Sequence, residues 1–153
     1  MKPDKHDIQK IGEYLVAAEL HKQGIKVGII SGAAENFDLM IASPKGDFVQ
    51  AEVKTRQTSR KMTILDCFTK PPDRSTFPII FVIINIKENK EEFFIIPPDE
   101  IKKRQTTGDE DYIKKYPKWV GRYWIPKEKI REFKDKWGLL FPVREQVGKL
   151  RAG

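Results

Sequence analysis

The stretch that decides the fold runs from residue 37 to residue 55 and reads FDLMIASPKGDFVQAEVKT. Two runs rich in β-branched and aromatic residues, 37–42 and 48–54, flank a Pro-Lys-Gly-Asp turn, which is typical of a β-hairpin. Side chains alternate between the two faces of a strand, so Glu52 and Lys54 are expected on one face, beside Asp38 on the neighbouring strand. The sequence therefore predicts two carboxylates and one ammonium group on one side of a sheet.

Around this hairpin, the pattern predicts one domain that begins and ends with helices. A helix is expected over 7–23, with an apolar stripe made by Ile8, Ile11, Leu15, Val16 and Ala18. Asp4 or Asp7 can cap this helix, and Gly24 follows it as a stop signal. We expect strands over 25–30, 78–86, 91–96 and 122–125, a strand or helical turn over 61–65, helices over 99–104 and 126–137, and a mobile loop over 106–111. This order predicts an α/β fold with one mixed β-sheet flanked by helices, and 78–86 near its centre.

The three charged residues of the hairpin suit the hydrolysis of a phosphodiester. Two carboxylates from different strands, Asp38 and Glu52, can hold Mg²⁺, with Mn²⁺ as a possible substitute. A lysine two residues along, Lys54, can orient the attacking water or stabilise developing negative charge. The alternative is a plain salt bridge on an exposed hairpin, which is the better reading of Glu-x-Lys alone. The apolar surroundings of Asp38 favour the catalytic interpretation.

Length, charge and cysteine content narrow the class of protein further. The chain has 153 residues and a net charge of +7, and 39% of its residues are hydrophobic, which fits a single domain with a real core. Its densest apolar run is too short to span a bilayer, so no membrane partner is expected. The N-terminus does not read as a signal peptide, and the single Cys67 cannot form an internal disulfide. These features predict a cytoplasmic protein.

A basic and aromatic segment lies near the C-terminus, at 114–137. Residues 114–136 contain nine Lys or Arg and three acids, a net charge of +6, with Tyr116, Trp119, Tyr123 and Trp124 interleaved. Cations mixed with aromatic side chains suit the backbone and bases of a nucleic acid. We therefore expect Lys118, Arg122 and Lys127 to bind DNA; the alternative is a solvated face whose aromatic side chains point into the core.

The arrangement around Asp38 and Glu52-Val53-Lys54 resembles the PD-(D/E)XK nuclease superfamily, and is similar to that of small endonucleases such as archaeal Holliday-junction resolvases. The resemblance covers residues 8–57. It implies a restriction-endonuclease-like core, Mg²⁺-dependent cleavage of DNA, and a further catalytic carboxylate on the preceding helix. By its spacing to Gly24, that carboxylate is Glu13. On a helical wheel Glu19 falls within the apolar stripe, so it stays as the alternative.

The sequence thus predicts a metal-dependent endonuclease with Glu13, Asp38, Glu52 and Lys54 as its catalytic residues. A homodimer is possible, because two-strand cleavage needs two sites. A catalytically inactive DNA-binding module on the same fold is the main alternative, and a protein-interaction domain with a basic face is a weaker one.

Overall fold

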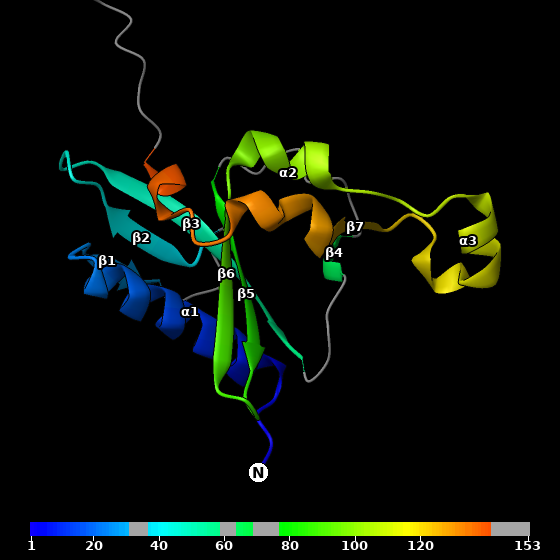
Figure 1. Ribbon diagram of the computed structural model, residues 1–153, viewed down its shortest axis with the longest axis horizontal. Helices are drawn as coiled ribbons and strands as arrows, with labels where there is room; N and C mark the ends of the chain where they lie inside the picture. The colour runs from blue at the N-terminus through cyan, green and yellow to red at the C-terminus, as the bar shows by residue number, and fades with distance from the viewer. Residues whose placement is uncertain (31–36, 59–63, 69–76, 142–153) are drawn as a thin grey trace, which may run out of the picture.

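A computed structural model describes residues 1–30, 37–58, 64–68 and 77–141 (Figure 1). The chain forms α1 (Lys5–Lys22), β1 (Val27–Ile29), β2 (Leu39–Ala42), β3 (Phe48–Gln57), β4 (Ile64–Phe68), β5 (Ile79–Asn85), β6 (Lys90–Ile96), α2 (Pro98–Arg104), α3 (Glu110–Lys115) and β7 (Tyr123–Pro126). Three 3₁₀ helices complete the fold: η1 (Pro117–Trp119), η2 (Lys127–Phe133) and η3 (Trp137–Leu140). None of the helices in the described part of the chain combines the length and apolar character needed to cross a membrane.

A mixed sheet of five strands, in the order β1-β2-β3-β5-β6, forms the centre of the molecule. β1, β2 and β3 are antiparallel neighbours, β3 runs parallel to β5, and β6 returns antiparallel to β5. The predicted α/β class and mixed sheet are therefore confirmed. β3, not the strand after residue 78, is the middle strand. The described residues also form a second sheet, β4 with β7, that the sequence did not predict.

Two apolar clusters cover the two faces of the large sheet. On one face, Val16 and Leu20 of α1 pack against Ala51 and Val53 of β3 and against alternate residues of β5. On the other face, Ile101 of α2 and residues of β7 and η2 pack against Phe81 and Phe94. Every residue from Ile79 to Ile84 is buried, as expected for an interior strand covered on both sides.

The buried face of α1 differs from the apolar stripe predicted for the first helix. Asp4 caps α1, with Asp7 reciprocating in a capping box. The buried positions of α1 are Ile8, Gly12, Glu13, Val16, Ala17 and Leu20. Ala18 is exposed and Glu19 only partly buried, so the expected stripe was rotated about the helix axis. The true buried face contains a charged residue and a glycine, which an apolar pattern does not reveal.

The C-terminal part differs more from the prediction. The expected helix over 126–137 is replaced by η2 and η3, separated by Asp135 in a left-handed conformation with φ 56°. α3 occupies part of the stretch expected to be a loop, and Figure 1 shows it projecting from the rest of the chain. The expected strand or turn over 61–65 overlaps β4, which is a strand; residues 61–63 lie outside the described residues.

Gly12 sets how closely α1 approaches β3. A Cβ atom at this position would lie 1.8 Å from Thr55 Oγ1 and 2.8 Å from Thr55 Cβ, so any larger residue would push the helix off the strand. We predict that Gly12→Ala lowers the free energy of unfolding by about 1–3 kcal/mol, the usual cost of overpacking. Urea denaturation measures this cost.

Gly28→Ala is the matched control, because the nearest atom to a Cβ there is Met40 O at 4.0 Å. Equal stability changes in the two variants would show that Gly12 is not a contact point between helix and sheet.

Candidate active site

The candidate site lies where β3 extends beyond its pairing with β2. Residues Phe48 to Ala51 of β3 pair with β2, and from Glu52 onward the opposite edge of β3 pairs with β5. The backbone groups of Val53 and Thr55 continue along the edge that β2 has left. Buried backbone groups need partners, so this edge requires hydrogen bonds from side chains.

Asp38 and Gln9 supply those hydrogen bonds. The Val53 N–H donates to Asp38 Oδ2 at 2.7 Å. The side-chain amide of Gln9 then donates to the Val53 carbonyl oxygen at 2.7 Å and accepts from the Thr55 N–H at 3.3 Å. A carboxylate just before β2 and an amide on α1 thus complete the ladder that β2 began.

Glu13 lies one helical turn beyond Gln9 and is buried. Its side chain is 3% exposed and accepts from Lys10 Nζ at 2.6 Å and from Gln9 Nε2 at 3.3 Å. The hydrogen bond to Glu13 raises the pKa of Lys10, and the negative charge of Asp38 raises it further. The N-terminal half of α1 therefore brings one carboxylate and one cation to the Asp38 end of β3.

The surroundings of Asp38 act on its pKa in both directions. Burial raises its pKa, and the nearby charges of Glu13 and Glu52 raise it further; the Val53 N–H and the charge of Lys54 act against this rise. Three carboxylates and Lys54 thus share one electrostatic environment. Crowded carboxylates of this kind are common at functional sites, although structural ion pairs also perturb pKa values.

Glu52 and Lys54 project from the face of β3 opposite α1, because the alternate residues Ala51 and Val53 pack against the helix. Their side chains are 28% and 33% exposed, and Lys54 Nζ lies 2.6 Å from Glu52 Oε1. The salt bridge considered as the plain alternative therefore forms. It forms next to Asp38, which a surface salt bridge does not require.

The surroundings of Glu13 and Glu19, the two candidates for the helical carboxylate, differ. Glu13 is buried beside Asp38, whereas Glu19 is partly exposed and pairs with Lys22 at 3.0 Å. Sequence reasoning missed Gln9 and Lys10. Their spacing of four and three residues from Glu13, on the same helix face, is the signal that could have found them.

Asp38 and Glu52 are the carboxylates of this site that could bind a magnesium ion. Among the described residues, no group of three or more His, Cys, Asp or Glu side chains is arranged to hold a metal. Mg²⁺ needs only one or two carboxylates, because it keeps several waters and takes phosphate oxygens. Asp38 and Glu52 are two such carboxylates. Burial raises the pKa of Asp38 and the charges of Glu13 and Glu52 raise it further, so a bound cation would favour its ionised form.

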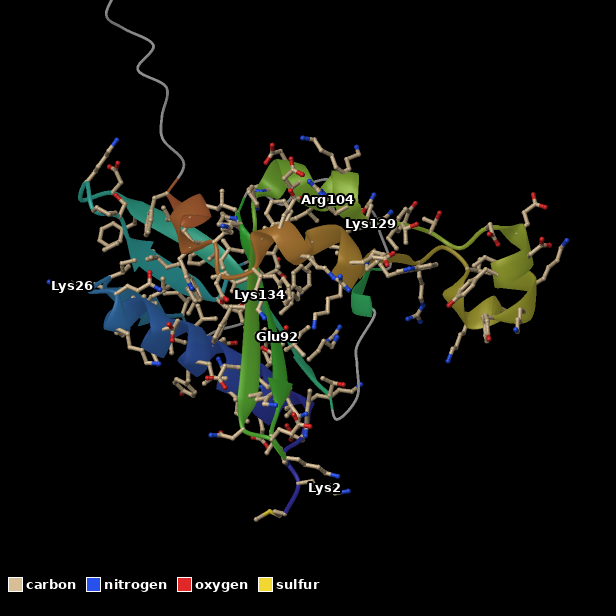
Figure 2. The ribbon with its side chains drawn as sticks, viewed as in Figure 1. Lys2, Lys26, Glu92, Arg104, Lys129 and Lys134 are labelled. Atoms are coloured by element: carbon tan, nitrogen blue, oxygen red, sulfur yellow. The ribbon has the colours of Figure 1, made fainter. Side chains whose placement is uncertain are left out.

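The three predicted DNA-binding residues lie in different elements. Lys118 and Arg122 are exposed on the projecting part of the chain beside α3. Lys127 begins η2 and pairs with Glu92 Oε2 of β6 at 2.5 Å. Lys134 pairs with the other oxygen of Glu92 at 3.0 Å, and Figure 2 shows these two residues together.

The aromatic residues of the segment are also divided. Trp124 is 8% exposed and packs against Tyr112, whose ring centroid is 5.6 Å away, while Tyr116 remains partly exposed. The backbone groups of Thr106 and Trp124 exchange two hydrogen bonds at 2.8 and 3.0 Å, which closes the base of the projecting segment. The aromatic residues of the segment thus include one that points into the core, as the alternative interpretation expected, and DNA binding by Lys118, Arg122 and Lys127 stays a prediction.

Comparison with known proteins gave little beyond these observations. No protein-family model matches the chain, and no curated protein matches it. Among solved structures, the bacterial homing endonuclease I-Ssp6803I is similar, with a TM-score of 0.47 and 17% sequence identity over 65% of this chain and 70% of that one. At this TM-score and identity, the similarity transfers neither a fold assignment nor an activity to this protein.

Proposed function

We propose that this protein is a metal-dependent endonuclease that hydrolyses DNA phosphodiester bonds, with a restriction-endonuclease-like core of the PD-(D/E)XK kind. The observation that carries the proposal is the position of Asp38, whose carboxylate lies at the edge of β3 within the electrostatic reach of Glu13, Glu52 and Lys54. The sequence predicts these four residues as one site, and they come from α1, from the residue before β2 and from β3.

Each side chain has a role that follows from its surroundings. Asp38 and Glu52 would hold Mg²⁺ or Mn²⁺, which when bound lowers the pKa of a water and neutralises charge on the phosphate. Lys54, beside Glu52, is placed to contact a phosphate oxygen and stabilise the charge that develops there. Glu13 is held by Lys10 and Gln9, so its carboxylate is fixed in place to orient a water near Asp38.

A catalytically inactive DNA-binding module remains the second candidate, and one observation favours it. The charged groups already satisfy one another: Glu13 pairs with Lys10, and Glu52 pairs with Lys54. A domain could keep such pairs for folding alone. A binding module would hold DNA whether or not Glu52 and Lys54 were present, and would not cleave it.

Cleavage assays separate the two candidates. On linear, single-stranded, nicked and branched DNA with Mg²⁺, we predict that Glu52→Gln and Lys54→Met each lower the cleavage rate by about 100-fold or more, since they remove groups that act on the transition state. For Lys54→Met, DNA affinity measured in Ca²⁺ should change little.

Helix α1 provides the matched control. Glu13→Gln should lower the cleavage rate, and Glu19→Gln should leave it unchanged, because Glu19 pairs with Lys22 away from Asp38. Wild-type protein that binds DNA but cleaves none of these substrates would favour the inactive module. Normal cleavage by Lys54→Met would remove that residue from the mechanism.

DNA binding by the basic segment is also a proposal, refined by the contacts of its cations. Lys118 lies in η1 and Arg122 directly precedes β7, and both are exposed, whereas Lys127 pairs with Glu92. The Lys118→Ala, Arg122→Ala double variant should weaken binding to all sequences alike. It should also flatten the plot of log affinity against log salt by up to about 1.8, at roughly 0.9 for each phosphate contact.

Lys127→Ala should change that slope less, because Lys127 already neutralises Glu92. Affinity titrations in Ca²⁺ at several salt concentrations measure both slopes. An unchanged slope in the double variant would show that the projecting segment is solvated surface. The proposed homodimer, which would bring two sites to two strands, stays a prediction.

A further inference from the structure

A cavity of about 680 Å³ lies at the start of β3, next to the candidate active site. Its lining includes Met40 of β2, Phe48 and Gln50 of β3, Phe77, Pro98 and Leu139. Pro78, which also lines it, accepts the Glu52 N–H at 3.1 Å through its carbonyl oxygen. The cavity therefore begins one backbone hydrogen bond away from a proposed metal ligand.

Two of the three β3 residues that line the cavity, Phe48 and Gln50, lie on the same face of the strand as the charged site, and the third, Val49, points to the other face. Alternate residues of β3 point to the same side, so Phe48, Gln50, Glu52, Lys54 and Arg56 form a single row opposite α1. Neighbours in this row are about 6.8 Å apart, twice the rise per residue of a strand. The row changes in order from an aromatic ring to an amide, a carboxylate, an ammonium group and an exposed guanidinium.

This order matches the parts of a nucleic-acid strand. The aromatic ring and the amide suit an unpaired base, which stacks on aromatic side chains and is read by hydrogen bonds at its edge. Lys54 suits the reacting phosphate directly and Glu52 would suit it through a bound metal ion, while Arg56 suits the following phosphate. Phe48 lines the cavity and is 68% exposed, so its ring is accessible to a base that enters from solvent.

We propose that the cavity binds an unpaired nucleobase adjacent to the phosphate at Glu52 and Lys54, so that the substrate is DNA with a single-stranded or displaced nucleotide at the cleavage point. This inference rests on the proposed nuclease function for the position of the phosphate. A perfectly paired duplex would have to unstack one base to fill the cavity, at a cost of a few kcal/mol.

The test compares two duplexes that differ only at one position, where one carries a bulged base and the other an abasic residue. Affinities are measured in Ca²⁺ for the wild type, Phe48→Ala and Ile86→Ala. The wild type should bind the bulged base about fivefold tighter or more, the value of one base stacked on an aromatic ring. Phe48→Ala should bring the ratio to about one.

Ile86→Ala is the control: it removes another exposed apolar side chain, 45% exposed, immediately after β5 and outside the cavity lining, and should keep the wild-type ratio. A wild-type ratio of one, or a ratio that survives in Phe48→Ala, would overturn the inference. Cleavage in Mg²⁺ is scored separately. If the protein cleaves DNA but shows no base-dependent affinity ratio, the base-binding proposal fails and the nuclease proposal stands. If the ratio depends on the base but no DNA is cleaved, the nuclease proposal fails and the base site stands.

Discussion

The architecture of the site depends on one unpaired strand edge. Because β2 ends its pairing at Ala51 while β3 continues to Gln57, the backbone groups of Val53 and Thr55 would be buried without partners. Asp38 and Gln9 satisfy them, which fixes the Asp38 carboxylate at this point and ties α1 to β3. Gly12 permits the approach, and the same stretch of helix carries Glu13 and Lys10. One backbone requirement thus gathers side chains from three elements.

Much of this could be predicted from the sequence, and the reason is local. The hairpin around residues 44–47 fixes which strands are neighbours, and strand alternation fixes that Glu52 and Lys54 share a face; both are short-range rules. The buried run from Ile79 to Ile84 was recognisable as an interior strand for the same reason. The site that these rules outline needs only one residue from outside the hairpin, Glu13.

The remaining errors come from tertiary contacts. The rotation of α1 depends on which of its residues touches Thr55, and no periodicity shows that a glycine and a glutamate face the sheet. The pairing of Lys127 and Lys134 with Glu92 joins segments 35 and 42 residues apart. Two cations of the basic segment are therefore members of an ion-pair cluster with Glu92. The cavity at the start of β3 was likewise not predictable, because Met40, Phe77 and Leu139, which line it, come from separate parts of the chain.

If Asp38 serves the proposed chemistry, its ionised carboxylate is kept in a partly buried site although burial opposes its charge, and thermal unfolding of Asp38→Asn measures what this charge costs the fold. Because the pKa of Asp38 is raised, the folded protein binds this proton more tightly than the unfolded chain, so ionisation of Asp38 destabilises the fold as pH rises above the usual aspartate range. Asn keeps an acceptor for the Val53 N–H without the charge. At neutral pH without metal, Asp38→Asn is therefore expected to melt above the wild type, while Mg²⁺ stabilises only the wild type. A variant that melts below the wild type, with Mg²⁺ stabilising both proteins equally, would contradict it.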